Sequence, residues 1–565
     1  MKVFAGRSLQ VSSLTFQVSS FTFEVSRSLL ALALYLVLAI ALTWPLGAKL
    51  DTTVVDRGDP FLNAFILDWN AHALTHDPLH LFNAPIFYPA KLSLAFSEHM
   101  TGIALLILPF HLGGFSAIAQ HNIAILLSFA LSGFGMFVLG RQVTRDAVAA
   151  FAAGVFFAFV SFKFSHLSHV QVIASGWIAL TLAALLRFQQ TRTTKHALLF
   201  AAAFTMNGLT NVYWLLFTGF AVAVTAVFLD FDWKRLALAI GVCAVLLVPF
   251  LVPYEMVSRE YSMLRNSYEA AQTSATWSDW VHRWPNGRPE RYLFPGIIPL
   301  ATAAYSARRR LAGRTAGVLA GARKPLLAVA LVCALAGCVL VHWHKSDIAF
   351  ALAVALTIAA IPIRVQTPAL WAAWIWIAIG FIGSFGENSF LQPVLFRLVE
   401  PFRATRSPAR WAIIAYCGLG ILMAIGTAAL PKLRYAIVAL AIIEVIPRIT
   451  WQHVPAQFPP VYHWLARNRP AAAIELPVGW NETEAAYVLA SSVHRVPIMN
   501  GVSGFDTDLH RTLSQATYDD RFFDLVEGSG VTTVVVHPAA HVTSTRLQEL
   551  VRFADGDVVC TIRAK

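Results

Sequence analysis

Charged residues are scarce in this chain. Asp, Glu, Lys and Arg together make up 13% of its 565 residues, whereas hydrophobic residues make up 57%. Soluble globular proteins have about 25% charged residues, so the composition excludes an ordinary soluble domain. Repeated apolar stretches of about 20 residues predict a polytopic membrane protein. The net charge of +12 does not indicate a nucleic-acid partner, because the basic residues cluster in short loops between apolar segments, where they set membrane orientation.

Cysteine is equally sparse, and its positions exclude a disulfide framework. Cys243, Cys333, Cys338 and Cys417 lie in apolar runs, where they are expected to act as small core residues, and Cys560 is alone in the polar tail. The spacing of Cys and His does not match a zinc site.

The N-terminal region lacks the features of a signal peptide or a coiled coil. A seven-residue repeat in residues 1–28 has no Leu/Ile seam, so we expect a disordered leader or a misassigned start. The apolar run that follows has no A-x-A-like cleavage site before "WPLGAKL", which predicts a membrane anchor.

About thirteen apolar segments predict a transmembrane domain over 29–450. They lie near 29–47, 121–140, 147–163, 170–187, 196–210, 213–229, 236–254, 293–305, 326–343, 347–363, 369–385, 411–428 and 435–449. The basic loops fall on one side if the N-terminus is cytoplasmic. The long connections 48–120, 255–292 and 386–410 and everything after 450 then lie outside the bacterial cytoplasmic membrane. The apolar stretch 101–118 is expected to be interfacial or re-entrant, because a full span there would invert everything downstream.

The tail over 451–565 has a different pattern. "AAAIELPV", "RVPIMNG", "VTTVVVHP" and "DVVCTIRA" are typical of short buried strands, and "VYHWLARNR", "ETEAAYVLASSV" and "TRLQELVRF" of helices. The predicted fold is therefore an α-helical polytopic membrane protein with a small C-terminal extracytoplasmic α/β domain.

Two carboxylates follow the first span, in "VVDRGDPFLNAFILDWN". Asp59 has a structural explanation, because Asp followed by Pro60 is a common helix start, here of an amphipathic helix lying on the membrane. Asp56 is not explained that way. Functionally, such a carboxylate would take a proton from an attacking hydroxyl or hold a divalent cation.

Four further candidates lie on the same predicted side. Glu98 and His99 belong to the same loop, and His166 and His169 lie at the outer end of the third span. Each histidine alone is more often a hydrogen-bonded interfacial residue, but their convergence favours a substrate-binding role.

The chain resembles a GT-C-type integral membrane glycosyltransferase of an uncharacterised bacterial branch, with YfhO-like features. The resemblance rests on "DRGDPFLNAFILDWN", "LFNAPIFYP", "LAFSEHMTG" and "PFRATRSPARW", and in the tail on "VYHWLA", "IELPVG" and "PIMNGVSGF". It implies a hexosyl- or pentosyltransferase that moves a sugar, with inversion, from a polyprenyl-phosphate donor to a glycan, lipid or protein acceptor. The family usually has a D-x-D-like or E-D pair. The D-R-G-D here leaves open whether Asp56 or Asp59 is the base.

A lipid-phosphate leaving group would require cations. Arg403, Arg406 and Arg410 in "FRATRSPAR" suit phosphate, since guanidinium donates two parallel hydrogen bonds. Alternatively, these arginines reach lipid headgroups from the end of a span.

Two other functions remain open. One is a transporter or flippase for a lipid-linked glycan, and the other is a non-catalytic envelope-assembly protein. Against a transporter, Glu255, Glu387 and Glu444 lie near predicted span ends rather than mid-span, and no inverted repeat is evident. The sequence implies no cofactor, and the divalent cation considered above is an open alternative.

Overall fold

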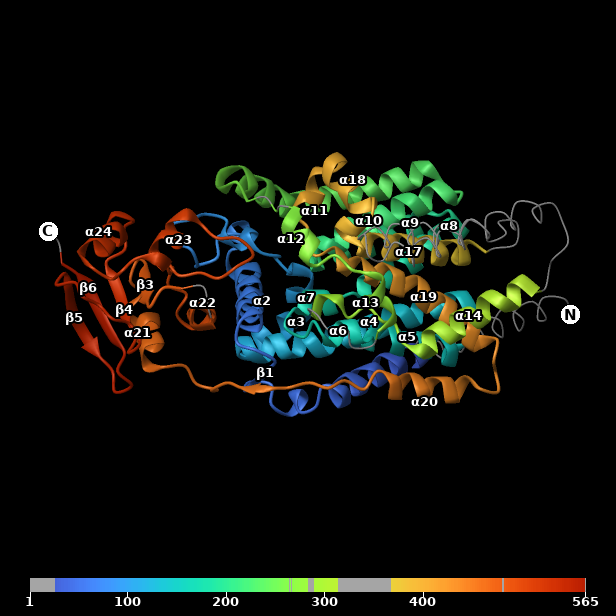
Figure 1. Ribbon diagram of the computed structural model, residues 1–565, viewed down its shortest axis with the longest axis horizontal. Helices are drawn as coiled ribbons and strands as arrows, with labels where there is room; N and C mark the ends of the chain where they lie inside the picture. The colour runs from blue at the N-terminus through green and yellow to red at the C-terminus, as the bar shows by residue number, and fades with distance from the viewer. Residues whose placement is uncertain are drawn as a thin grey trace, which may run out of the picture.

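A computed structural model describes residues 26–263, 265, 267–282, 289–312, 367–479 and 482–563. A helical bundle forms most of it, and a small sheet with its own helices lies at one end of the long axis (Figure 1). The predicted segments 326–343 and 347–363, and most of the predicted leader, lie outside the described residues.

Apolar helices of different lengths form the bundle. They are the helix Ser26–Leu42, α4 (Ala117–Thr144), α5 (Ala147–Phe159), α6 (Ser161–Phe164), α7 (Val170–Ile173), α8 (Gly176–Thr191), α9 (Thr194–Thr210), α10 (Val212–Phe228), α11 (Trp233–Tyr261), α14 (Ile297–Ala312), α17 (Pro368–Ser384), α19 (Ala412–Ala428) and α20 (Arg434–Glu444). Within the described ranges, five stretches are long and apolar enough to cross a membrane: Ala117–Thr144, Ala147–Phe164, Val170–Thr191, Trp233–Tyr261 and Pro408–Ala428. The total of thirteen spans stays a prediction.

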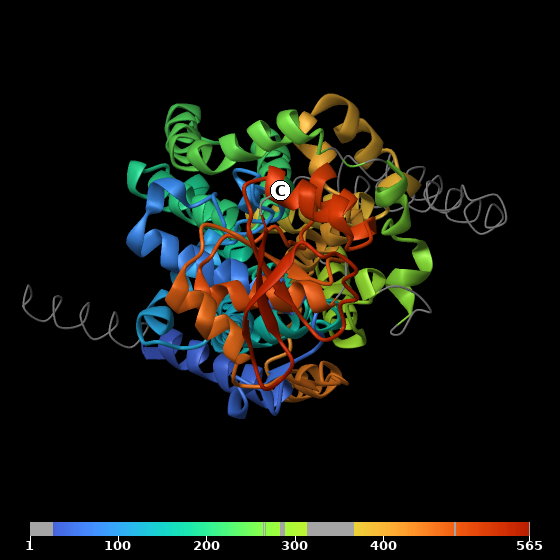
Figure 2. The same ribbon diagram turned by 90° about the vertical axis from the view of Figure 1, so that its left-hand side faces the viewer.

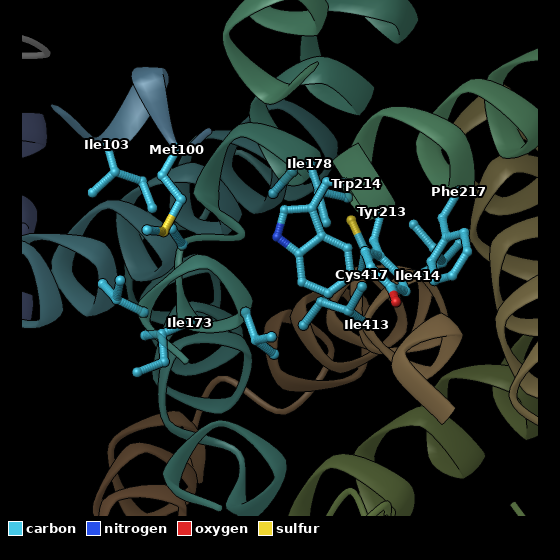
Figure 3. Packing of buried hydrophobic residues seen from close by; sticks show 14 of the residues in the cluster. Met100, Ile103, Ile173, Ile178, Tyr213, Trp214, Phe217, Ile413, Ile414 and Cys417 are labelled. Atoms are coloured by element: carbon cyan, nitrogen blue, oxygen red, sulfur yellow. The ribbon is translucent and has the colours of Figure 1, made fainter. Parts of the chain in front are cut away.

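Burial separates the inner helices from the outer ones. α19 is buried along almost its whole length. Figure 3 shows Trp214 and Phe217 of α10 close to Ile413, Ile414 and Cys417 of α19. By contrast, α11 exposes large apolar side chains such as Val245, Val248 and Val252. A helix with an uncovered apolar face is what a lipid bilayer accommodates.

Two predicted boundaries need correction. The expected span 435–449 forms only the 11-residue α20, which ends at Glu444, because Pro447 cannot continue a helix and disfavours helical backbone just before it. The chain then runs without regular structure to β2 (Gln452–His453). The expected loop 255–292 begins late, because α11 continues to Tyr261. It then contains α12 (Ser267–Gln272), α13 (Trp277–Val281) and η4 (Pro289–Arg291).

The first loop, residues 48–120, contains β1 (Thr53–Val54), α2 (Asp59–His76), η2 (Pro78–His80), η3 (Ser93–Phe96), α3 (Thr101–Leu112) and the start of α4. The apolar residues of α2 do not form a face for the membrane surface, because Phe61, Phe65 and most of its other residues are buried within the protein. α3 has 12 residues, about 18 Å at 1.5 Å per residue, which is too short to cross a bilayer.

The tail carries a four-stranded mixed sheet in the order β3 (Ala473–Leu476), β4 (Thr533–Val536), β6 (Val558–Ile562), β5 (Leu547–Arg552). β3 and β4 are parallel, and the other pairs are antiparallel. The accompanying helices are α21 (Pro460–Asn468), α22 (Glu482–His494), α23 (Asp508–Gln515) and α24 (Asp520–Gly528). "TRLQELVRF", expected as a helix, forms β5. Pairing with buried β6 outweighs its local helix preference. "RVPIMNG" forms only a bridge from Ile498 to Ala473.

The first loop and the tail pack against each other. β1 pairs with β2, matching Thr53 to His453. The backbone N–H of Phe87 donates to the carbonyl of Asn500 over 3.0 Å, and Arg495 forms an ion pair with Asp68. Figure 2 shows the tail in front of the bundle when viewed along the long axis. The two regions therefore lie on the same side of the bundle.

Candidate active site

Four of the predicted site residues line one cavity of about 430 Å³, called here the Asp59 cavity. Asp59 at the start of α2, His166 and His169 between α6 and α7, and Arg406 between η8 (Glu400–Ala404) and η9 (Pro408–Trp411) contribute to its wall. The other lining residues are Ser165, Ser168, Glu269, Gln272, Thr273, Glu290 and Ser407.

Asp59 and His169 form an ion pair inside this cavity. Nε2 of His169 lies 3.0 Å from Oδ2 of Asp59, and half of the Asp59 side chain remains exposed. Burial alone would raise the pKa of Asp59, but the hydrogen bond and charge of His169, with Arg406 and Arg410, outweigh it and lower the pKa. Asp59 is therefore an ionised carboxylate that opens to the cavity.

The local backbone shows that Asp59 does not cap α2. Gly58 is the N-cap of α2, Asp59 is the first helical residue, and no side chain makes a capping hydrogen bond. Pro60 fits the first turn because its missing N–H needs no partner there. The alternative explanation of Asp59 as a helix cap therefore does not hold. Its carboxylate is nevertheless favourably placed at the positive end of the helix dipole.

Asp56 connects two segments and is not among the lining residues of the cavity. Its Oδ1 accepts the backbone N–H of Gly58 over 2.9 Å, and its Oδ2 accepts the hydroxyl of Ser168. Ser168 directly precedes His169 in the chain, so these bonds hold the start of α2 beside His169. The geometry fits a positioning role for Asp56.

Glu290 in η4 is a site residue that the sequence reasoning missed. Its Oε2 lies 2.7 Å from Nε2 of His166, and its Oε1 lies 2.9 Å from Nη2 of Arg410. Burial would raise the pKa of Glu290, but the charges and hydrogen bonds of Arg410 and His166 hold it well below its usual range. The guanidinium of Arg410 also lies 5.0 Å from the ring centre of Tyr213.

Glu98 lies in a smaller adjoining cavity of about 130 Å³, called here the Glu98 cavity, which shares His169 and Arg406 with the first. Both carboxylate oxygens of Glu98 are buried without a hydrogen-bond partner in the described part of the chain. Burial raises the pKa of Glu98 to about 7, against the opposing charges of Arg410, His169 and Arg406. The remaining polar lining includes Gln171, Tyr213, Tyr254 and Arg265.

Besides Asp56, two predicted residues lie outside both cavities. His99 is buried and its Nδ1 lies 2.7 Å from the hydroxyl of Thr101. Burial lowers the pKa of His99 to about 3, so its ring is neutral and packs the first loop. Arg403 is exposed, and its Nε donates to the carbonyl of Phe396 over 3.0 Å. Neither residue is placed to contact a substrate held by Asp59.

The residues at this site do not form a metal-ligand set. Among the described residues, no group of three or more His, Cys, Asp or Glu side chains is arranged to hold a metal ion. Asp59 and Glu290 face histidine or arginine partners instead.

Comparisons with known proteins yield a distant structural resemblance. No protein-family model matches the sequence, and no curated protein matches it. Among solved structures, the crystal structure of ArnT from Cupriavidus metallidurans in the apo state is similar over 96% of this chain and 98% of that chain, with 14% sequence identity and a TM-score of 0.36. A likeness this remote carries no inference about function, which rests on the site itself.

Proposed function

We propose that the chain is a GT-C-type membrane glycosyltransferase that moves a sugar from a polyprenyl-phosphate donor to an envelope acceptor at the outer face of the cytoplasmic membrane. One observation carries this proposal: the Asp59–His169 pair opens into a cavity that also presents Arg406. A base and a phosphate-binding cation on the wall of one cavity are what an inverting transfer from a lipid phosphate requires.

Asp59 is the proposed general base. The acceptor oxygen attacks the anomeric carbon, its proton passes to the Asp59 carboxylate, and the bond from that carbon to the phosphate oxygen breaks with its electrons on phosphate. The ion pair with His169, at 3.0 Å, keeps Asp59 ionised and fixes its direction. Asp56 supports this arrangement from outside the cavity through Gly58 and Ser168.

Arg406 is the proposed phosphate-binding residue. It lines both cavities, and its backbone is fixed by two hydroxyls: the N–H donates to Tyr213 over 2.9 Å, and the carbonyl accepts from Thr273 over 2.6 Å. Its guanidinium forms no ion pair with a carboxylate of the described residues. Arg410, by contrast, is neutralised by Glu290. Arg406 therefore has its charge available for a phosphate.

The donor's polyprenyl chain needs an apolar path to the site. Tyr254 of α11 lines the Glu98 cavity, whereas Val252 and Met256 on the same helix are exposed apolar residues. α11 thus has one side at the cavity and another suited to lipid. We place the polyprenyl chain along this helix.

A lipid-linked glycan transporter is the second candidate, and Glu98 favours it. A buried carboxyl with a pKa of about 7 can gain and lose a proton near neutral pH, as proton-coupled transport requires.

Transfer by the purified chain distinguishes the two functions. The protein in lipid nanodiscs is incubated with a panel of polyprenyl-phosphate sugars and with lipid, glycan and peptide acceptors. The enzyme predicts release of free polyprenyl phosphate together with a glycosylated acceptor, and loss of both with Asp59→Asn. Movement of the intact lipid-linked sugar across proteoliposomes without any transfer would instead support the transporter.

A further inference from the structure

Glu98 is a buried carboxyl group that the reaction steps described above do not use. It lies between η3 and α3, and one tyrosine holds the backbone on both sides of it. The hydroxyl of Tyr254 donates to the carbonyl of Ser97 over 2.9 Å and accepts the backbone N–H of His99 over 2.9 Å. Glu98 is therefore fixed against α11, the helix along which we place the polyprenyl chain.

The carboxyl group of Glu98 is buried without a hydrogen bond. Neither of its oxygens has a hydrogen-bond partner in the described part of the chain. The side chain of Gln171 lies close enough to lower the pKa of Glu98, but the two groups do not reach ordinary hydrogen-bond geometry. An ionised carboxylate that is buried without hydrogen bonds is costly. The proton is therefore expected to stay on Glu98 up to about neutral pH, in agreement with its raised pKa.

The groups around Glu98 are mostly basic. The titratable and charged side chains that line the Glu98 cavity with it are His169, Tyr213, Tyr254, Arg265, Arg406 and Arg410. Of these, His169, Arg265 and Arg410 each pair with a carboxylate that lies outside the lining of this cavity. A guanidinium donates hydrogen bonds but cannot accept a proton, so the arginines leave the Glu98 proton to a ligand. A phosphate accepts hydrogen bonds from arginine and from a neutral carboxyl alike.

We propose that Glu98 is a second catalytic residue, which gives its proton to the donor phosphate as the bond to the sugar breaks. This inference rests on the proposed transferase function. Arg406 lines both cavities, so a phosphate bound by Arg406 at their junction has Asp59 on one side and Glu98 on the other. The two carboxyl groups then act on opposite ends of the reaction, Asp59 on the acceptor and Glu98 on the leaving group.

The proposed step balances without a further reactant. The acceptor hydroxyl loses its proton to Asp59 as its oxygen bonds to the anomeric carbon. The bond from that carbon to the phosphate oxygen breaks with its electrons on the oxygen, and the Glu98 proton passes to the phosphate. The product phosphate thus carries one proton, in place of the one that the acceptor lost. Asp59 and Glu98 return to their starting states by exchanging protons with water.

The pH dependence of kcat tests this role. The full chain in nanodiscs is assayed with a polyprenyl-phosphate sugar and an acceptor that give transfer in the panel described above. Glu98 must be protonated to act, so the wild-type kcat should fall as pH rises through the pKa of Glu98 in the substrate complex. That pKa is about 7 without a ligand, and the negative charge of a bound phosphate raises it further.

Three carboxyl variants identify the group responsible. Glu98→Gln should lower kcat about a hundredfold and remove the fall at high pH, because glutamine has no proton to give. Its affinity for a non-hydrolysable donor analogue should be almost unchanged, since the amide can still donate a hydrogen bond to phosphate. Glu98→Asp keeps a carboxyl and should keep the fall. The control is Glu387→Gln, because burial also raises the pKa of Glu387 but this residue lines neither cavity.

The outcomes separate this proposal from the transferase function itself. A wild-type kcat in Glu98→Gln, a fall at high pH that persists in that variant, or an equal loss in Glu387→Gln would overturn the role of Glu98 and leave the transferase function in place. No transfer by the wild type with any donor would overturn both. If Glu98→Gln fails to fold, a wild-type kcat that does not fall with rising pH overturns the proposal, and a fall displaced in Glu98→Asp supports it.

Discussion

Replacing Glu290 with glutamine should destabilise the protein strongly while leaving its shape almost unchanged. The carboxylate of Glu290 contacts His166 at 2.7 Å and Arg410 at 2.9 Å. The side chains of His166 and Arg410 are only 1% and 4% exposed. Glutamine keeps the size of the side chain but removes the negative charge, so Arg410 loses its counterion while still buried, and His166 loses the carboxylate that it contacts.

The expected loss of stability comes mainly from the buried charge of Arg410. Removing one member of a buried ion pair costs about 3–5 kcal/mol, because the other charge stays buried. Arg410 cannot relieve its charge by losing a proton. Glu290 is 19% exposed, so water offsets part of the effect, and we expect a loss of about 3 kcal/mol at pH 7.

The pH dependence has a defined sign. The pKa of Glu290 is lower in the folded protein than in the unfolded chain. Its stabilising contribution is therefore complete above the unfolded value of about 4.3 and is lost as pH falls toward the folded value. The difference between wild type and the Gln variant should be largest near neutral pH and should shrink below about pH 4.

Denaturant unfolding in detergent micelles, followed by tryptophan fluorescence, measures this difference. Glu255→Gln is the control, because its pair with Arg259 is mostly exposed and should contribute under about 1 kcal/mol. A double-mutant cycle with Arg410→Gln isolates the pairwise interaction. A stability loss at pH 7 no larger than that of Glu255→Gln, or additive effects in the cycle, would refute the argument.

Three further predictions follow from the same geometry. Because the pKa of Glu98 is raised to about 7, ionisation should make wild type progressively less stable than Glu98→Gln between about pH 4.5 and 7, by up to about 3 kcal/mol. Unfolding across that range measures the difference, and a constant difference would contradict burial as the cause. Arg406→Lys should weaken binding of a non-hydrolysable polyprenyl-phosphate sugar analogue by about 1.5–3 kcal/mol, whereas Arg403→Lys should not. Equal affinity of both variants in a binding titration would place the phosphate elsewhere. Reporter fusions after Arg434 and after Arg467 should report opposite compartments. Two cytoplasmic reports would overturn the predicted orientation.

The sequence predicts the long apolar helices well. The segments expected at 121–140, 147–163 and 170–187 correspond to helical stretches 117–144, 147–164 and 170–191. A run of about 20 apolar residues in a bilayer can satisfy its backbone hydrogen bonds only as a helix, so composition alone predicts the secondary structure of such a run. The local sequence pattern does not predict the secondary structure of a segment that pairs with a distant one. β5 is an example, because it pairs with β6, whose apolar residues are buried.

The candidate site, too, could be predicted from the sequence only in part. Asp59, His166, His169 and Arg406 could be named from chain position and side-chain chemistry, and the structure places them on one cavity. Glu290 could not, because its partners are 124 and 120 residues away and an acidic residue between arginines in a loop is typical of a solvated surface. His99 could not be excluded from the site by its sequence, since it is burial in the fold that lowers the pKa of His99 and keeps its ring neutral.

The most direct test of the catalytic assignment compares two carboxylates three residues apart. Asp59→Asn and Asp56→Asn are purified in nanodiscs, and initial rates of sugar transfer from the polyprenyl-phosphate donor to the acceptor are measured. Asp59→Asn should be slower by about a hundredfold or more, because a positioned base is lost. Asp56→Asn should keep most of the rate, since the side-chain oxygen of asparagine can still accept a hydrogen bond from the backbone N–H of Gly58. Wild-type rates with Asp59→Asn would contradict the assignment of Asp59 as the base.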